Sequence, residues 1–334
     1  MNHSTQCGVI GQGTGPFTPL PGDDGHSRVG YGAETTVTSG DGHAFVVRRT
    51  GSGTPILLLH DMAATQCAWD PVREALSWSN AVCTWDARGH GAARGTPESA
   101  VPTLGLLAAD LDAALAACAP DAAVLVGHGL GALTILEYLR NYDDGRVSGV
   151  VLVDQSPRML TVPDWQLGLF GGFREGDALE FEAHIRADFA EAWLSLQAHG
   201  ADAGSHARHD EPPHRSLREL ATGSMLALWR SMIGRDYRVD LATLRVPLLA
   251  VLGGGSKLYD AAELGRWFEA FVPHAEVVRY PKADHAPHSA APARFARDVA
   301  AFSAQWEPVA RHPALRAAPH IGERQLVQVA QAAA

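Results

Sequence analysis

Five residues in the middle of the chain have the spacing of a turn that presents a catalytic nucleophile. The run Gly127-His128-Gly129-Leu130-Gly131 follows a short apolar segment and leads directly into a helical pattern. In a Gly-x-Ser-x-Gly turn, the same strand–turn–helix setting lifts a serine above a sheet, where it attacks an acyl carbon. Here Gly129 occupies the serine position and has no side chain with which to attack. The motif therefore predicts the setting of acyl-transfer chemistry without its usual nucleophile.

The elements around this turn alternate between strands and helices. The expected strands are short apolar or β-prone runs at 35–39, 43–49, 55–60, 81–86, 122–126, 147–154, 246–252 and 275–280. Apolar residues recur at helical spacing in 65–76, 104–118 and 292–302. The turn Gly40-Asp41-Gly42 joins the first two strands as a hairpin. Long apolar strands that alternate with helices predict an α/β fold, with a mostly parallel sheet flanked by helices.

This alternation stops between residues 156 and 239. Helical patterns at 178–196 and 217–233 predict a helical cap, inserted into a core that comprises residues 34–155 and 240–306. Residues 1–33 are rich in glycine and proline and are expected to form a flexible N-terminal arm. Residues 307–334 are expected to form a C-terminal extension with one further helix at 323–333.

Composition limits the classes of function. The chain has 334 residues, of which 46% are hydrophobic, enough for one large core with a small subdomain. Its net charge of −10 is opposite in sign to what a nucleic-acid binder needs. Its longest apolar runs are too short to span a bilayer, and the first residues lack the pattern of a signal peptide. The four cysteines are scattered, which indicates free thiols. We expect a cytoplasmic protein that binds neither nucleic acid nor membrane, in an oligomeric state left open.

Four pieces of the chain, in order, resemble the α/β-hydrolase family over about residues 35–305. They are the strand PILLLH with the following Asp61-Met62, the loop DARGHG, the turn around Gly129, and the segment PKADHAPH, which contains His285. The resemblance implies the α/β-hydrolase fold and hydrolysis of an ester, thioester or lactone, with a small-molecule acyl or polyketide-like substrate and no metal or organic cofactor. It also implies a base, an acid and an anion site.

The resemblance places the base at His285, in the loop between the last strand and the last helix. The acid is either Asp154 or Asp260. The family commonly carries its acid after the strand that here reads VPLLAVL, but Ser256 and Lys257 stand there and Asp260 comes a few residues late. Asp154 ends the strand that follows the turn helix, an alternative location in this fold. Because catalytic groups gather at the carboxyl ends of strands, we prefer Asp154.

The anion site is expected at the backbone N–H groups of Met62 and Leu130. Asp61 stands where the family usually has glycine. A carboxylate that points into the site would oppose ordinary ester chemistry, and one that points away would leave it unchanged. Asp61 and the neighbouring His128 are therefore kept as candidate site residues.

Two groups of side chains in the expected cap are weaker candidates. Trp165, Phe170 and Trp193 would either line an apolar substrate pocket or form a helical core. A polar loop carries several side chains that could bind a metal, namely His206, His209, His214, Asp210 and Glu211. Since structural metal sites need fixed spacing on defined elements, this loop is not predicted to be a metal site.

The glycine at position 129 leaves three explanations open. The first is that a serine was removed to silence an active hydrolase. The second is a natural protein that works without a covalent intermediate, and the third is a binding protein that retains an inactive catalytic site. A lyase, cyclase or decarboxylase needs only a base and an anion site, which His285 with Asp154 and the two amides would supply. A water molecule activated by His285 is a further route to slow hydrolysis. The retained histidine and acid argue against an inactive catalytic site.

The same turn also fits the dinucleotide fingerprint Gly-x-Gly-x-x-Ala, at Gly127, Gly129 and Ala132. Asp154 would then bind a ribose, and the protein would be an oxidoreductase. However, this fingerprint normally opens its domain, whereas here a hairpin and two strands precede it. The oxidoreductase also leaves DARGHG and His285 unexplained, and it ranks behind the hydrolase.

Overall fold

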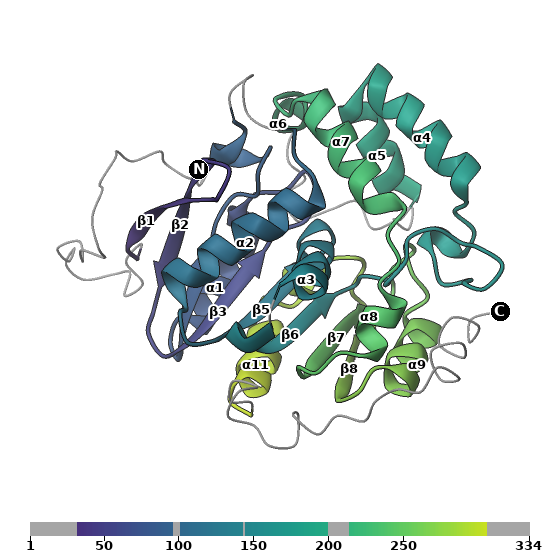
Figure 1. Cartoon of the computed structure of the whole chain (residues 1–334). Coiled ribbons are helices and arrows are strands. Elements are labelled where there is room, and N and C mark those ends of the chain that lie inside the picture. The colour runs from purple at the N-terminus through teal and green to yellow at the C-terminus, as the bar shows by residue number, and fades with distance from the viewer. Residues whose placement is uncertain (1–31, 96–100, 143, 200–213, 306–334) are drawn as a thin grey trace, which may run out of the picture.

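A single eight-stranded sheet forms the centre of the chain (Figure 1). The computed structural model describes residues 32–95, 101–142, 144–199 and 214–305. Along the sheet the strand order is β1-β2-β4-β3-β5-β6-β7-β8. The strands are β1 (Glu34–Thr38), β2 (Ala44–Thr50), β3 (Thr54–Leu59), β4 (Asn80–Thr84), β5 (Ala123–His128), β6 (Val147–Val153), β7 (Leu248–Gly253) and β8 (Ala275–Tyr280). The hairpin β1–β2 is antiparallel and joins β4 antiparallel, while β4, β3, β5, β6, β7 and β8 pair in parallel. The predicted mostly parallel sheet is confirmed.

Helices cover both faces of this sheet. They are α1 (Asp70–Leu76), α2 (Leu104–Cys118), α3 (Leu130–Asn141), α4 (Glu175–Ala187), α5 (Phe189–His199), α6 (His214–Arg218), α7 (Thr222–Ile233), α8 (Arg238–Ala242), α9 (Ala261–Phe271), α10 (Pro287–Ala290) and α11 (Pro292–Ser303). Short 3₁₀ turns are η1 (Gln66–Trp69), η2 (Gly91–Ala93), η3 (Asp144–Arg146) and η4 (Leu169–Gly171). Apolar residues of α1 and α11 pack on one face of the sheet, and those of α2, α3, α8 and α9 pack on the other.

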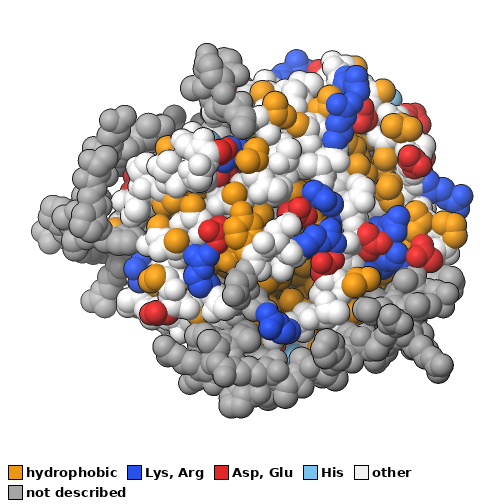
Figure 2. Space-filling model, viewed as in Figure 1, with side chains coloured by type: hydrophobic (Ala, Val, Ile, Leu, Met, Phe, Trp, Pro, Cys, Tyr) orange, Lys and Arg blue, Asp and Glu red, His pale blue; other side chains and the backbone are white. Residues whose placement is uncertain are grey.

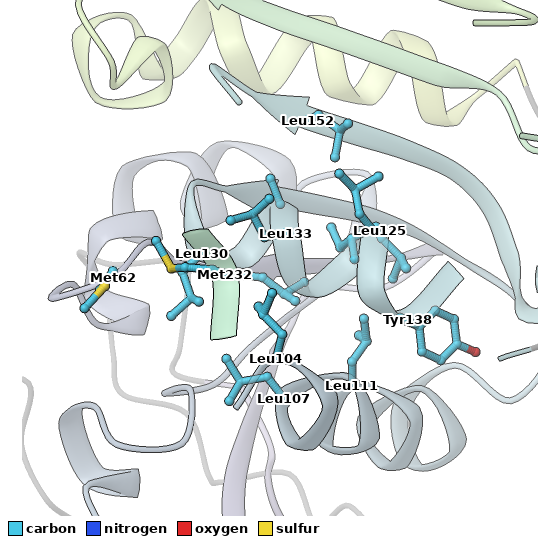
Figure 3. Packing of buried hydrophobic residues seen from close by; sticks show 14 of the residues in the cluster. Met62, Leu104, Leu107, Leu111, Leu125, Leu130, Leu133, Tyr138, Leu152 and Met232 are labelled. Atoms are coloured by element: carbon cyan, nitrogen blue, oxygen red, sulfur yellow. The ribbon is translucent and has the colours of Figure 1, made fainter. Parts of the chain in front are cut away.

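The central strands are buried on both sides. Every residue of β5 and β6 is buried, as expected for parallel strands with helices above and below. On one face, Leu107 and Leu111 of α2 point toward Leu130 and Leu133 of α3 (Figure 3). Burying apolar area of this kind contributes about 25 cal/mol per Å² and fixes α3, and with it the turn at its N-terminus, against the sheet.

The segment between β6 and β7 folds into helices α4 to α8, and α4–α7 lie together at the top of the molecule in Figure 1. The helical pattern predicted over 178–196 is interrupted, because Asp188 has an extended backbone (φ −159°). Its carboxylate accepts a hydrogen bond from the Glu191 amide and so caps the start of α5. The second predicted helix begins later than expected, at Thr222. The division into core and cap stays a prediction.

Several expectations concern residues outside the described ranges. They include the N-terminal arm up to residue 31, the C-terminal extension from residue 306 and most of the histidine-containing loop, at 200–213.

Among the described cysteines, Cys67, Cys83 and Cys118 are free thiols. In the described part of the chain, every helix is too short or too polar to cross a bilayer. Lys and Arg side chains lie beside Asp and Glu on the face in Figure 2. The cytoplasmic location stays a prediction.

Candidate active site

The carboxyl ends of the parallel strands bring the candidate residues together at one edge of the sheet. Asp61 follows β3, Gly129 follows β5, Asp154 follows β6, Ser256 follows β7 and His285 follows β8. Strands that run in the same direction end at the same edge, which is where α/β folds place their ligands. The sheet topology therefore explains why five residues spread over 225 positions of the sequence meet in one site.

The turn after β5 has the tight backbone of a nucleophile elbow. Gly129 has φ +51° and ψ −113°, a conformation that strains any residue with a Cβ atom. A Cβ at Gly127 would lie 2.5 Å from the Ala132 nitrogen, and one at Gly131 would lie 2.3 Å from the Leu59 carbonyl oxygen. The glycines on either side are thus required by close packing between β5, α3 and β3. The turn therefore has the sharp backbone that the motif predicted, with glycine at its centre.

The side chain of Asp61 fills the space above Gly129. A Cβ built on Gly129 would lie 1.8 Å from Asp61 Oδ1 and 2.2 Å from Asp61 Cγ. Oδ1 accepts hydrogen bonds from two backbone amides, Met62 N at 2.7 Å and Leu130 N at 2.8 Å. These are the two amides predicted to form the anion site, and they do converge on one oxygen. The oxygen belongs to the protein itself, which decides between the two orientations left open for Asp61.

Two buried histidines hold the loop that carries Asp61. His60 Nδ1 donates to the Asp61 carbonyl at 2.7 Å, and its Nε2 accepts the Ala87 amide at 2.8 Å. His90 Nε2 accepts the Ala63 amide at 3.0 Å, and burial lowers the pKa of His90 to about 3. A neutral imidazole can accept an N–H in this way, whereas an imidazolium cannot. The DARGHG loop therefore positions Asp61, a role that the sequence did not indicate.

Asp154 and His285 form a hydrogen-bonded pair. His285 Nδ1 donates to Asp154 Oδ2 at 2.9 Å. The fully buried Asp154 carboxylate also accepts the Gly253 amide at 2.9 Å and the Ser256 hydroxyl at 2.7 Å. Asp154 has φ +44°, which is rare for a residue other than glycine and directs its carboxylate beneath the imidazole. Ser256 was noted in the sequence only as a departure from the family pattern, and its contact with Asp154 was missed.

His285 is held between two carboxylates. Its Nε2 lies 3.6 Å from Asp61 Oδ2, on the side opposite to Asp154. Burial disfavours the charged imidazole, but the hydrogen bond to Asp154 and the Asp61 carboxylate outweigh burial and raise the pKa of His285 to about 10. Burial also favours a neutral Asp61, yet the neighbouring histidines His128 and His285 and the Leu130 amide hold the pKa of Asp61 well below its usual value. At neutral pH these shifts keep Asp61 as a carboxylate and His285 as an imidazolium.

His128 and His288 support this arrangement from the buried side. The ring of His128 lies 4.5 Å from that of His285, and its Nε2 donates to the His285 carbonyl oxygen at 2.9 Å. Burial, followed by the charge of His285, lowers the pKa of His128 to about 4. His288 packs on the Trp69 ring at 4.3 Å and is also held neutral by burial. His128 therefore fixes the loop of His285 and does not take part as a charged group.

Asp61, His128 and His285 are also the one group of potential metal ligands found among the described residues. One donor atom from each lies within 4.8 Å of the others. One polar atom of each residue is already bound by the protein, however, since Asp61 Oδ1 binds two amides, His128 Nε2 binds a carbonyl and His285 Nδ1 binds Asp154. We therefore assign no metal to this group.

Other predicted site residues have different positions. Asp260 caps α9 by accepting the Ala262 and Glu263 amides, so it is not the partner of His285. Trp165 is fully buried, and its indole N–H donates to the Arg158 carbonyl, which makes it a core residue. Trp193 packs against Phe189 and is also buried, while Phe170 is half-buried and contacts Phe173. Lining of a pocket remains a prediction for Phe170.

We expect His285 to titrate far above the usual range of a histidine. The charged and titratable groups around it are Asp61, Asp154, His128, His288 and Tyr259. Because the folded-state pKa is raised from 6.5 to about 10, the stability that His285 contributes is complete below pH 6.5 and is lost as the pH rises from 6.5 to 10. NMR titration of the imidazole should give a midpoint near 10 in the intact protein, and a lower one in Asp61→Asn. A midpoint at or below 7 in the intact protein would contradict the assigned charge state.

Comparison with known proteins agrees with this fold. A family profile described as the Alpha/beta hydrolase family matches residues 56–298. The chain is 27% identical over 252 residues to a pimeloyl-[acyl-carrier protein] methyl ester esterase of Aliivibrio salmonicida, covering 71% of this chain and 87% of that protein. It is also 27% identical over 256 residues to a 2-(acetamidomethylene)succinate hydrolase of Mesorhizobium japonicum, covering 74% and 86%.

Solved structures share the same fold. An esterase from Exiguobacterium antarcticum superposes with a TM-score of 0.69 at 16% identity, covering 81% of this chain and 99% of that one. Est816, described as an N-acyl homoserine lactone degrading enzyme, has a TM-score of 0.62 at 20% identity, covering 80% and 99%. At these identities the structures support the fold, while the sequence matches support a hydrolase. The geometry also argues against dinucleotide binding, in which Asp154 would bind a ribose, because the Asp154 carboxylate is hydrogen-bonded to Gly253, Ser256 and His285.

Proposed function

Because the chain belongs to the α/β-hydrolase family, we propose that it hydrolyses a small-molecule ester, thioester or lactone without a serine nucleophile. In this proposal Asp61 takes the place of the missing side chain, His285 transfers protons, and Asp154 orients His285. The observation that carries the proposal is the position of the Asp61 carboxylate, which lies above Gly129 and accepts hydrogen bonds from both anion-site amides.

The fit between Asp61 and Gly129 supports a natural pair of residues. Any side chain at position 129 would collide with Asp61, since even a Cβ would approach Oδ1 to 1.8 Å. A serine removed from an active hydrolase would leave an empty space, and the residue after His60 would be the glycine usual in the family. Two complementary departures in contact with each other are better explained by a protein that uses them together.

The charge state of His285 argues against simple water activation. With a pKa of about 10, the imidazole is protonated at neutral pH and cannot remove a proton from water. It can donate a proton, and it becomes a base only when one of its two carboxylate neighbours loses its charge. The filled anion site also opposes direct attack on an acyl carbon, because the oxyanion that would form has no free amides to bind.

A non-hydrolytic lyase or cyclase is the second candidate, and the same filled anion site favours it. Such a reaction would use the imidazolium of His285 as a proton donor and would need no binding of an acyl oxyanion. It predicts products without incorporated water.

A substrate panel with three variants tests the proposal. The panel contains methyl esters, acyl thioesters and lactones, the last including an N-acyl homoserine lactone. At least one of these classes should be hydrolysed by the intact protein, and at least 10²-fold more slowly by Asp61→Asn and His285→Gln. Asp260→Asn is the matched control, because asparagine also caps a helix and Asp260 lies at the start of α9. A fluorophosphonate should not label the protein. Equal turnover in all four proteins would show that the reaction does not take place at Asp61 and His285.

A further inference from the structure

We propose that Asp61 is a covalent nucleophile, and that it attacks the saturated carbon of a strained lactone at its alkyl C–O bond. This inference rests on the proposed function and names its substrate class. It follows from the two different environments of the Asp61 carboxylate oxygens.

One oxygen is held as the carbonyl oxygen of an activated acyl group would be. Oδ1 accepts the Met62 and Leu130 amides at 2.7 and 2.8 Å. Paired backbone amides stabilise negative charge on the oxygen of an acyl carbon under attack. In this chain the acyl carbon whose oxygen they hold is Cγ of Asp61. The site is therefore arranged to hydrolyse an ester of Asp61 itself.

The other oxygen is available to form that ester. Oδ2 is not bound by the amide pair and faces His285 Nε2 at 3.6 Å. The Asp61 side chain is 16% exposed and that of His285 is 26% exposed, so both reach the solvent side of the site. The carboxylate remains ionised over the physiological range, which keeps Oδ2 anionic and able to attack.

The geometry selects a saturated carbon as the target. Attack on a substrate carbonyl would create a second oxyanion, although the two amides already hold Oδ1. Displacement at a saturated carbon creates no oxyanion on that carbon, and the negative charge leaves with the departing group. In a strained lactone, the departing group is the ring carboxylate, which needs no proton donor, and ring opening supplies driving force that an open-chain ester lacks.

The reaction balances in two steps. In the first, the lone pair of Oδ2 forms a bond to the alkyl carbon, and the bond from that carbon to the ring oxygen breaks to give a free carboxylate. In the second, water adds to Cγ, with the developing charge on Oδ1 held by Met62 and Leu130. The Cγ–Oδ2 bond then breaks, so Oδ2 leaves as the hydroxyl of a hydroxy acid, and the oxygen of water takes its place in Asp61.

His285 has the right position for the second step. Esterification removes the negative charge of Asp61, one of the two carboxylates that keep the imidazole protonated. The imidazolium therefore releases its Nε2 proton to solvent, and the neutral His285 accepts a proton from the attacking water and passes it to the departing alkoxide. The second proton of water returns to Nε2 as the Asp61 carboxylate forms again, so the cycle ends with His285 protonated and one proton released. Asp154 holds Nδ1 protonated throughout, so Nε2 is the nitrogen that exchanges protons.

The position of an isotopic label distinguishes this route from ordinary acyl cleavage. (R)-β-Butyrolactone is incubated with the intact protein in H₂¹⁸O, with the uncatalysed reaction subtracted. Our proposal predicts 3-hydroxybutyrate of inverted configuration and ¹⁸O in the peptide that contains Asp61. The first product carries the original, unlabelled Oδ2 in its hydroxyl group, and from the second turnover onward this hydroxyl carries ¹⁸O. Retained configuration with ¹⁸O in the product carboxylate, and an unlabelled Asp61 peptide, would overturn it.

A trapping experiment provides the second test. In His285→Gln the first step can proceed and the second is slowed, so the Asp61 peptide should gain the mass of one lactone. Asp61→Asn/His285→Gln is the matched control, because asparagine keeps an Oδ1 acceptor for the two amides but lacks the anionic oxygen. The absence of an adduct in His285→Gln, together with the absence of ¹⁸O in Asp61 of the intact protein, overturns the inference. Hydrolysis of the ester panel under those conditions would leave the proposed function standing, and its absence would remove both.

Discussion

Gly129→Ser alone is expected to yield no serine esterase, whereas Asp61→Gly/Gly129→Ser is expected to hydrolyse simple acyl esters. The single variant places a Cβ 1.8 Å from Asp61 Oδ1, so either the turn or the Asp61 loop must shift. Its new hydroxyl would also meet an anion site that the Asp61 carboxylate already fills. Removing that carboxylate in the double variant frees both the space and the two amides.

The expected gain is large because both amides become available at once. Loss of one donor in an oxyanion hole lowers kcat about 10²–10³-fold, so the double variant should exceed Gly129→Ser by about 10²-fold or more. His285 would also lose one carboxylate neighbour, which lowers its pKa toward the range of a general base.

The measurement is hydrolysis of p-nitrophenyl acetate and labelling by a fluorophosphonate, with Asp61→Gly as the matched control that lacks a nucleophile. Circular dichroism and thermal unfolding establish that each variant is folded. Equal esterase activity in Gly129→Ser and the double variant would contradict a blocked anion site. A folded double variant with neither hydrolysis nor labelling would show that Asp61 is not what prevents serine chemistry.

The framework of this site could be predicted from sequence because its signals are local. The Gly-x-x-x-Gly spacing around Gly129 and the order of the apolar runs predicted the fold and the ends of its strands. The order of the motifs along the chain predicted His285 as the base. Asp154 could be preferred over Asp260 because it directly ends a strand, and the hydrogen bond to His285 agrees with that preference.

The function of Asp61 could not be derived in the same way. Which way its side chain points depends on φ +62° at Ala63, on the histidines His60 and His90, and on the space left by Gly129. The contacts of this loop with His90 and Leu130 join segments that are 27 and 69 residues apart, so no pattern within one stretch of sequence reports them. Ser256 was missed for the same reason, since its partner Asp154 is 102 residues away.

Asp154→Asn is expected to lower kcat by about 10³–10⁴-fold with little change in overall structure. The fully buried carboxylate accepts three hydrogen bonds, from Gly253 N, Ser256 Oγ and His285 Nδ1. An asparagine must turn its NH₂ group toward one side. An NH₂ group that faced Gly253 would meet a backbone N–H, which cannot rotate or lose its proton. The NH₂ group therefore faces Ser256 and His285, where the serine hydroxyl can rotate to accept.

His285 can accept from that NH₂ group only by losing the proton on Nδ1. The proton then sits on Nε2, the nitrogen that must take up a proton from water, and the imidazole also loses the carboxylate that raises its pKa. The corresponding change in a serine protease lowers kcat about 10⁴-fold through the wrong tautomer. Steady-state kinetics on the best substrate of the panel measures the loss, and NMR of the imidazole should report both the changed tautomer and a lower pKa.

Ser256→Ala is the matched control, because it removes one hydrogen bond from Asp154 and leaves the bond to His285 intact. A single hydrogen bond of this kind is worth about 0.5–1.5 kcal/mol, so kcat should fall by about tenfold at most. If Asp154→Asn keeps more than a tenth of the activity of the intact protein, the orientation of His285 by Asp154 does not limit the reaction. If Ser256→Ala loses as much as Asp154→Asn, placement of the Asp154 carboxylate, more than the tautomer it imposes, controls the rate.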